Sequence, residues 1–443
     1  MEQGDYLGPQ SRPSIGLWIP LSLQHVFAMF GATILVPILT GLDPATALFT
    51  AGTGTLVYIL ITGGKVPAFL GSSFAFIAPL FAVSAAYGGA WVPFAMGGAI
   101  ASGLFYCLVA LIIKVAGTKW LDKAMPPVVI GSVIIVIGLI LAPVAMNMAS
   151  RVNPNDPDTY SLVYLSIAAF TLLVTVVSNF FLKGFFSTIP ILIGLISGYL
   201  FTLILGAFVP AYAIISFNVV SEAAWFGLPT FHAPRFDPII MFTFVIVSLA
   251  TICEHLGDMV VVSRVVGQDF YKNPGLHRTL AGDGLASIWA SLWGGPPNTT
   301  YGENIGVMAI TRVYSVWVIG GAAVLAVLLS FFRKFGALIQ TIPTPVLGGI
   351  SMLLFGIIAS SGLRTLVESG VDYKDKRNLT ISSVILVIGI GGGRLAFELT
   401  GGIEFQLAGV ALATVVGILL NLAFPGSQGR SGSNCRKNPL PLR

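Results

Sequence analysis

Acidic residues stand inside long apolar stretches of this sequence, where an isolated charge is costly. Glu254 and Asp258 lie four residues apart, one helical turn, with apolar residues on either side. Glu303 lies in a second stretch, Gly294 to Arg312, which reads GGPPNTTYGENIGVMAITR. Carboxylates accept hydrogen bonds from solute N–H groups, bind cations or carry protons. The sequence therefore predicts a site that handles a polar solute.

The composition identifies the medium around these acids. Of 443 residues, 55% are hydrophobic and 9% are charged, whereas about a quarter are charged in soluble domains. This is the composition of a multi-pass membrane protein with no separate soluble domain. Cys107, Cys253 and Cys435 have neither disulfide nor metal-ligand spacing, so we expect free thiols.

We expect fourteen membrane-spanning segments, because apolar stretches of about 20 residues cross the roughly 30 Å hydrocarbon core as helices. They are placed at 17–38, 45–62, 67–85, 90–113, 126–146, 160–181, 187–210, 238–263, 279–295, 298–311, 314–332, 343–362, 378–393 and 405–424. With a cytoplasmic N-terminus, 18 of the 23 basic residues fall on the inner side, as the positive-inside rule requires. The same bias explains the net charge of +5 without a nucleic-acid partner. Residues 1–16 lack the features of a cleaved signal peptide, so we expect the first segment to be retained and both termini to be cytoplasmic.

The two halves of the chain resemble each other. Residues of the fifth segment recur with the same spacing in the twelfth: Pro127, Gly131 and Gly138 match Pro345, Gly349 and Gly356. Gln24-His25 in the first segment has a counterpart in Glu254-His255 of the eighth. Both pairs are seven segments apart, an odd number, so the halves would enter the membrane in opposite directions. This is the seven-plus-seven inverted repeat of many secondary transporters, with coincidence among Gly and Pro as the alternative.

The third and tenth segments cannot be continuous helices. The third contains GSSFAFIAP at 71–79, and the tenth opens with PPNTT. Unpaired backbone groups cost several kcal/mol each inside a bilayer. We therefore expect two short antiparallel β-strands near the midplane, each followed by a half-helix. The half-helix N-termini would direct free N–H groups to one central spot, near Phe74 and Gly302.

Glu254 belongs at the middle of the membrane. It precedes Arg264 by ten residues, about 15 Å along a helix. Asp258 would share its volume, which favours protonation of at least one of the two acids. No intramembrane lysine or arginine is expected to neutralise them or Glu303, which points to protons, a cation or solute N–H donors.

Several of these residues also have structural interpretations. Thr300 and Glu303 can form a helix capping box. His25 and His255 can simply join helices, Phe74 can be a core residue, and Asp258 can be a structural acceptor. These alternatives stay open at this stage.

Four stretches carry a resemblance to the nucleobase-ascorbate transporter family. They are LSLQHVFAMFGATILVP (21–37), KVPAFLGSSFAFIAP (65–79), CEHLGDMVV (253–261) and NTTYGENIGVMAITRVYS (298–315). The family signature appears as Glu303, Asn304, Gly306, Thr311 and Arg312. The sequence is similar to the family's bacterial uracil permeases, since purine-transporting relatives usually have Gln-Asn where this chain has Glu303-Asn304. The resemblance runs from about residue 20 to residue 424.

The resemblance implies an architecture and an activity. It implies a core domain (17–125 and 238–342), a gate domain (126–237 and 343–424) and a homodimer, and it leaves 425–443 as a polar basic tail. It also implies proton-coupled symport of uracil across the bacterial inner membrane by alternating access, without a cofactor. The implied solute ligands are the Glu254 and Glu303 carboxylates, the backbone N–H groups at Phe74 and Gly302, and apolar contacts from Ala32 and Tyr301. The implied proton-coupling residues are Glu254, Asp258 and His25.

Two positions depart from the uracil permeases of this family. The uracil permeases of the family have histidine at the position of Asp258, whereas purine-type relatives have aspartate there, as this chain does. Phe355 stands where a tyrosine is expected. A xanthine or purine carrier of the same fold is therefore the first alternative, and an anion carrier of the same architecture the second. An enzyme is disfavoured because there is no DDxxD-type metal motif, and ATP-driven transport because there is no P-loop.

Overall fold

Apolar helices make up most of the molecule, and the computed structural model describes residues 7–399 and 403–424. Within these residues, eight helical stretches are long and apolar enough to cross a bilayer. They are α1 (Ile15–Thr40), α2 (Pro44–Ile61), Phe74–Ala116 with α3 (Ile77–Tyr87) and α4 (Trp91–Ala116), Pro127–Ser150 with α6 (Pro127–Leu139) and α7 (Ala142–Ser150), α8 (Leu162–Phe181), α9 (Pro190–Phe208), α11 (Pro238–Val266) and α16 (Thr344–Glu368). The protein is thus a helical multi-pass membrane protein, and the predicted tail at 425–443, with Cys435, lies outside the described residues.

Shorter elements complete the chain between these helices. They are α5 (Lys119–Ala124), α10 (Asn218–Glu222), α12 (Leu276–Leu292), α13 (Gly302–Thr311), α14 (Val316–Ser330), α15 (Arg333–Gln340), α17 (Lys376–Ile390), α18 (Gly409–Ala423) and the strands β1 (Leu70–Ser72), β2 (Asn298–Thr300), β3 (Arg394–Leu399) and β4 (Ile403–Ala408). Several helices start where the sequence supplies a cap and a proline. Asp43 accepts from the Ala45 N–H ahead of α2, and Asp237 accepts from Ile239 and Ile240 ahead of α11.

Helices α6 and α16, from the fifth and twelfth predicted segments, cross at glycines. A Cβ atom on Gly131 would lie 2.8 Å from the Gly362 carbonyl oxygen, and one on Gly362 would lie 2.6 Å from the Gly131 oxygen. The backbones therefore touch, as in other membrane helix pairs with small residues at the interface. Further along, a Cβ on Gly138 would lie 2.5 Å from the Phe355 oxygen. Of the glycines noted in the sequence, Gly131 and Gly138 thus serve this close helix packing, whereas a Cβ on Gly356 would meet no atom within 4 Å.

The predicted pairing of the two broken segments is confirmed. Strands β1 and β2 pair antiparallel, with Leu70 opposite Thr300 and Ser72 opposite Asn298. In each strand, the backbone N–H and carbonyl of the first residue both bond to a side-chain hydroxyl from a neighbouring helix. Thr55 of α2 accepts from the Leu70 N–H and donates to the Leu70 carbonyl, at 2.9 and 3.2 Å. Ser287 of α12 makes the same two bonds with Asn298, at 3.1 and 2.9 Å.

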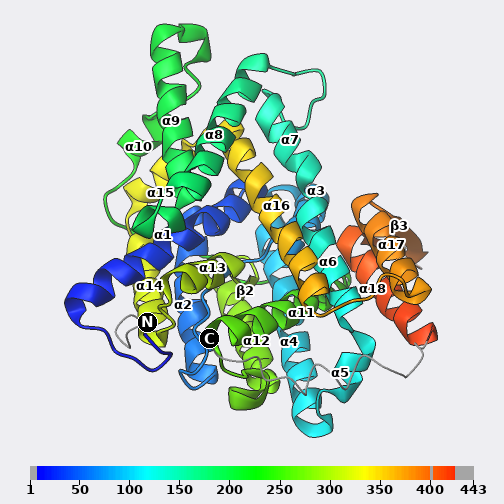
Figure 1. Cartoon of the computed structure of the whole chain (residues 1–443). Helices are drawn as coiled ribbons and strands as arrows, with labels where there is room; N and C mark the ends of the chain where they lie inside the picture. The colour runs from blue at the N-terminus through cyan, green and yellow to red at the C-terminus, as the bar shows by residue number, and fades with distance from the viewer. Residues whose placement is uncertain (1–6, 400–402, 425–443) are drawn as a thin grey trace.

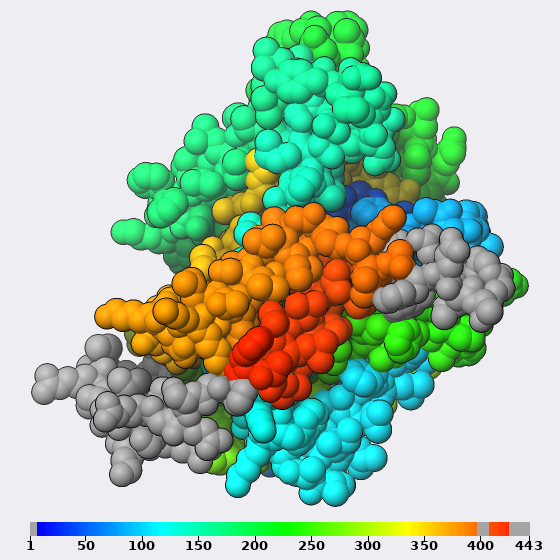
Figure 2. Space-filling model, turned by 90° about the vertical axis from the view of Figure 1, so that its right-hand side faces the viewer, coloured from blue at the N-terminus to red at the C-terminus, as the bar shows by residue number. Residues whose placement is uncertain are grey.

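The helices form two groups by their contacts (Figure 1). In one group α2, α4, α12 and α14 pack on one another, with α1 against α14 and α11 against α4. In the other group α16 packs on α6, α7 and α8, and α17 packs on α18 and α6. Figure 2 shows α17 and α18 side by side on one face of the molecule, above the cyan residues near α5. Helix α11 contacts both groups, because it also packs on α6 and α18.

A second pair of strands was not predicted. Strands β3 and β4 form an antiparallel hairpin, from Arg394 opposite Ala408 to Leu399 opposite Ile403. The expected helical segment at 405–424 is therefore wrong at its start, since 405–408 belong to β4 and the helix α18 begins at Gly409. The sequence signal is the alternation of apolar and polar residues in RLAFEL and IEFQLA, which has the period of a strand.

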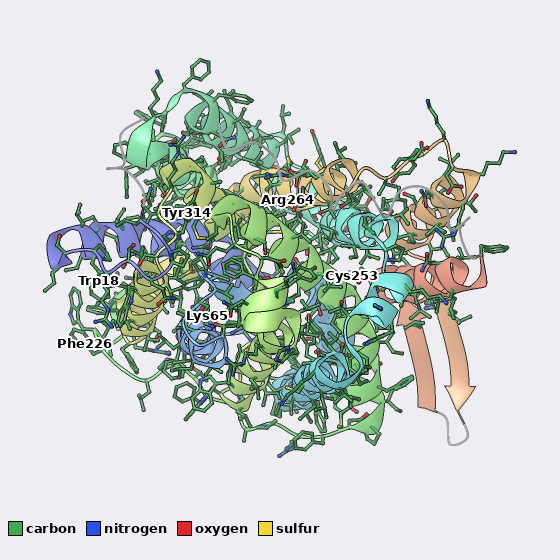
Figure 3. All side chains as sticks on the ribbon, turned by 60° about the horizontal axis from the view of Figure 1, so that its bottom comes forward. Trp18, Lys65, Phe226, Cys253, Arg264 and Tyr314 are labelled. Atoms are coloured by element: carbon green, nitrogen blue, oxygen red, sulfur yellow. The ribbon has the colours of Figure 1, made fainter. Side chains whose placement is uncertain are left out.

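Figure 3 shows the side chains on the ribbon, with Trp18 and Phe226 toward one side and Cys253 toward the other. Trp18 and Phe226 lie at the margin of the view, and Phe226 is 65% exposed. Cys253 is buried and Cys107 is half-buried, and both thiols are free.

Candidate functional site

Both paired strands lead directly into short helices, as predicted. After β1 the chain enters a 3₁₀ turn at Phe74–Phe76 and then α3, and after β2 it enters α13. The pairing is extended by the Ser73 N–H, which donates to Pro297 O, and by the Tyr301 N–H, which donates to Phe69 O, both at 2.9 Å. The first N–H groups of a helix have no partner within it. Two sets of backbone donors therefore begin where the strands end.

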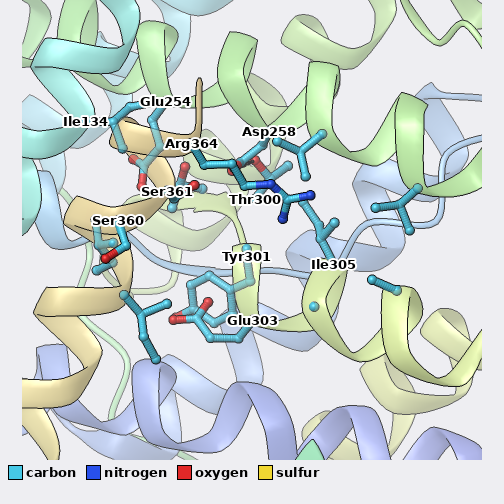
Figure 4. A pocket seen from close by; sticks show the side chains of 18 of the residues that line it. Ile134, Glu254, Asp258, Thr300, Tyr301, Glu303, Ile305, Ser360, Ser361 and Arg364 are labelled. Carbon is cyan, nitrogen blue, oxygen red and sulfur yellow. Dashed lines mark hydrogen bonds between the residues drawn. The ribbon is translucent and has the colours of Figure 1, made fainter. Parts of the chain in front are cut away.

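A cavity of about 310 Å³ lies beside these helix starts, the size of a site for a small molecule. Its walls come from the end of β2, α13, α11 and α16 (Figure 4). Six of the predicted site residues line it: Phe74, Glu254, Asp258, Tyr301, Gly302 and Glu303. Ala32 and His25, which are buried, are not among the described residues that line the cavity.

The three acids differ in how they are held. Asp258 accepts a 2.8 Å hydrogen bond from the Thr300 hydroxyl at the end of β2. Glu254 has a buried carboxylate oxygen, Oε2, with no hydrogen-bond partner among the described residues. A buried polar atom without a partner costs about 1–3 kcal/mol. Glu254 is therefore the acid with the strongest demand for a hydrogen-bond donor from a solute.

Thr300 and Glu303 do not form a capping box. The N-cap residue of α13 is Tyr301, and no side chain caps it. The Thr300 hydroxyl is directed to Asp258 instead. Glu303 lies in the first turn of α13 and lines the cavity, so its carboxylate remains available to a solute.

His25 connects two helices. The Asn304 side-chain amide of α13 donates to His25 Nδ1 and to the His25 carbonyl oxygen, both at 3.1 Å. Nδ1 then acts as an acceptor, which corresponds to a neutral ring with its proton on Nε2. In this conformation His25 positions α13 on α1 and does not contact the cavity.

His255 also joins helices, through a residue that the sequence interpretation missed. His255 Nδ1 lies 2.9 Å from Asp283 Oδ2 and Nε2 lies 3.1 Å from the Thr279 hydroxyl. His255 and Asp283 are fully buried, between α11 and α12. The available signal was Asp283 itself, an acid within the predicted segment 279–295. The pair fixes the part of α11 that carries Glu254.

Helix α16 contributes more to the cavity than expected. The ring of Phe355 meets the ring of Phe74 edge to face, with centroids 5.7 Å apart. The predicted segment ends at 362, but α16 continues to Glu368, and Arg364 lines the cavity. Arg364, which the sequence places beyond the end of the membrane segment, pairs with Glu368 and not with the acids of the cavity.

A mostly apolar cavity with a few acidic and hydroxyl side chains, placed at interrupted helices inside a multi-pass protein, is typical of a membrane transport protein. Comparison with known proteins agrees: a model of a permease family matches residues 16–396. Uracil permease of Bacillus subtilis (strain 168) is 53% identical over 427 residues, which cover 95% of each chain. Uracil permease of Escherichia coli (strain K12) is 48% identical over 421 residues, 94% of each chain. The chain belongs to the xanthine/uracil permease family, whose members are transporters and not enzymes.

Solved structures share the fold at low sequence identity. The transmembrane domain of the cyanobacterial bicarbonate transporter BicA has a TM-score of 0.65 at 16% identity and covers 93% of this chain and 98% of its own. The murine Solute Carrier 26 family member A9 anion transporter, in the inward-facing state, has a TM-score of 0.68 at 11% identity and covers 96% of this chain and 69% of its own. These likenesses concern the fold alone.

Proposed function

We propose that this protein is a uracil carrier that imports the base together with protons. The observation that carries the proposal is the unpartnered Glu254 oxygen in a cavity that also holds Glu303 and the free N–H groups at the start of α13. The names of the relatives in Bacillus subtilis and Escherichia coli support uracil as the solute.

The chemistry of uracil matches this set of groups. Its flat ring has two N–H donors and two carbonyl acceptors. The carboxylates of Glu254 and Glu303 would accept from the ring N–H groups, and the N–H groups near Phe74 and Gly302 would donate to a carbonyl. The rings of Phe74 and Tyr301 would supply the aromatic slot. Ala32, a small buried residue on α1, would pack behind these two rings.

The transport cycle follows from the proposed architecture of fourteen spans in two inverted halves. Features repeated seven segments apart support it, namely the paired strands β1 and β2, the helix hydroxyls of Thr55 and Ser287 that bond to them, and the helices α6 and α16. A core domain (17–125 and 238–342) would carry the site past a gate domain (126–237 and 343–424). The protein would be a homodimer in the bacterial plasma membrane with both termini in the cytoplasm.

Protons would couple to the solute through the acids of α11. A proton on Glu254, or shared with Asp258, would prepare the cavity for uracil on the acidic outer side, and its loss to the cytoplasm would release the base. His25 would respond to the same change through Asn304, whose amide it contacts.

Uptake by purified protein in liposomes tests this proposal. We expect labelled uracil to accumulate when the outside is acidic, and a protonophore to abolish the accumulation. Uracil levels that merely equilibrate whether or not a gradient is imposed would refute proton coupling. Bicarbonate or sulfate uptake in its place would assign the protein to the anion carriers, a class that the three acids of the cavity disfavour.

A purine base is the second candidate solute, favoured by Asp258, which stands where uracil permeases of the family have histidine. An excess of unlabelled xanthine, hypoxanthine or thymine added to the uracil assay distinguishes the two. We expect xanthine to leave uracil uptake within about twofold, and strong competition by xanthine would make this a purine carrier.

Gly302 offers a direct test of where the solute lies. A Cβ atom there would meet no other atom within 4 Å, and the residue lines the cavity. We expect Gly302→Ala to fold normally and to weaken uracil binding by about tenfold or more, as a methyl group would occupy solute space at a cost of about 1.4 kcal/mol. Calorimetry measures this. Gly16→Ala, in equally open space on α1, is the control, and equal affinities for the two variants would remove Gly302 from the site.

A further inference from the structure

The cavity has two walls of opposite hydrogen-bonding character. Glu254, Asp258 and Glu303 supply acceptors from α11 and α13. The facing residues of α16 supply donors, from Ser360, Ser361 and Arg364. Arg364 is the one cationic side chain among the described residues that line the cavity. Figure 4 shows Arg364 extending from α16 toward the part of the cavity that holds Asp258 and Thr300.

The three donors lie close together on α16. Arg364 follows Ser361 by three residues and Ser360 by four, so each serine is a neighbour of Arg364 on the helix surface. Neither serine hydroxyl donates to another group within residues 7–399 and 403–424. Ser360 is exposed and Ser361 is half-buried. These hydroxyls are therefore accessible from the cavity.

Arg364 is held in place through one nitrogen only. Its Nε donates to Glu368 Oε1 at 2.6 Å, one turn further along α16. The other oxygen of Glu368 pairs with Arg264 at the end of α11, which Figure 3 shows beside α16. The two terminal nitrogens of Arg364 have no hydrogen-bond partner in the described part of the chain. A guanidinium anchored at Nε presents the remaining donors as a rigid fork.

Arg364 belongs to the more exposed end of the cavity, because its side chain is 56% exposed. Arg264 is ten residues beyond Glu254 on α11, about 15 Å along the helix. Glu368 contacts Arg264 at that level, so Arg364 and Glu368 lie near it. A solute that moves between Glu254 and the opening passes the donors of α16.

We propose that Ser360, Ser361 and Arg364 form a second binding station, at the mouth of the cavity, for the carbonyl side of a planar heterocycle. The proposal rests on nucleobase transport as the function. In the deep site, the ring N–H groups donate to the carboxylates. At the mouth of the cavity, the ring carbonyls accept hydrogen bonds from the terminal nitrogens of Arg364 and from the serine hydroxyls. Glu368 is a positioning residue for Arg364. The solute thus exchanges one set of partners for the other as it enters or leaves.

Comparison of binding with transport tests the station. We expect Arg364→Gln to raise the KM for uracil transport about tenfold, while the Kd for the deep site in detergent stays within about twofold. Arg364→Lys keeps a donor and is expected to recover part of the loss, and Ser360→Ala with Ser361→Ala is expected to raise KM about threefold. Arg394→Gln, at an exposed residue of β3, is the control and should match the wild type.

A uracil analogue that lacks one carbonyl shows whether Arg364 contacts the solute or has only a structural role. Pyrimidin-2-one lacks the second carbonyl of uracil, so we expect its KM to be much less affected by Arg364→Gln. An equal loss for both solutes, reproduced by Arg264→Gln, would show that Arg364 acts only through its link to α11 and would overturn the station. If the wild-type protein neither binds nor transports a nucleobase, the proposed function itself fails, which is a distinct outcome.

Discussion

Replacement of Glu254 by glutamine is expected to lower the affinity for uracil by on the order of 100-fold and to remove proton-driven accumulation. The change is nearly isosteric, but it turns one carboxylate oxygen into an N–H donor. A protonated Glu254 still accepts from a solute N–H group through its carbonyl oxygen, whereas glutamine can turn an N–H donor toward that group and cannot carry a proton. A hydrogen bond of about 0.5–1.5 kcal/mol is then lost, and a buried donor without an acceptor costs about 1–3 kcal/mol more. Calorimetry gives the Kd, and liposomes with an imposed pH gradient give the accumulation.

A matched glutamate gives the control for this experiment. Glu222 on α10 is exposed and lies outside the lining of the cavity. Glu222→Gln should therefore bind and accumulate uracil as the wild type does. If Glu254→Gln retained affinity within a factor of three, the carboxylate would not contact the solute, and the unpartnered oxygen would need another explanation.

Removal of the Asp283 side chain is expected to give the largest loss of stability. Asp283→Ala leaves the buried ring of His255 without its partner at Nδ1, between α11 and α12. A buried donor left without its hydrogen-bond partner costs about 1–3 kcal/mol. We expect a lower midpoint of thermal unfolding in detergent, and weaker uracil binding because α11 carries Glu254.

An exposed aspartate provides the comparison. Asp269 pairs with Lys272 at 3.2 Å, and its side chain is 52% exposed. Asp269→Ala should change the free energy of unfolding by about 0.5 kcal/mol or less. Equal melting temperatures for the two variants would mean that the Asp283–His255 contact does not hold α11 in place.

The central part of the site is predictable from the sequence because a bilayer penalises unpaired backbone. Pro296, Pro297 and the glycines of the tenth segment rule out a helix there, and the third segment has the same difficulty. Inside a membrane, the backbone N–H and carbonyl groups of these two segments can be satisfied by pairing the segments with each other. Glu254 was placed by counting residues from Arg264. The arrangement of Phe74, Gly302 and Glu303 around one cavity follows from these two constraints.

Other features depend on tertiary contacts that local pattern does not carry. Arg364 lies past the apolar part of its helix, and only the packing of α16 beside α11 brings it to the cavity. Asp283 is one acid in a helix of small residues, and its role depends on His255 from another helix. The hairpin of β3 and β4 was missed because residues 394–404 fall between two predicted spans, and 405–408 were counted as the start of the last one.

The pairing of β1 with β2 has a consequence for how the protein is made. About 230 residues separate Leu70 from its partner Thr300. At about 5–20 residues per second, a ribosome leaves the first strand alone for on the order of 10–50 seconds. Its exposed amides have to stay hydrated, or shielded by the insertion machinery, until the second half of the chain emerges. Synthesis of this protein therefore includes an interval in which β1 exists without its partner strand.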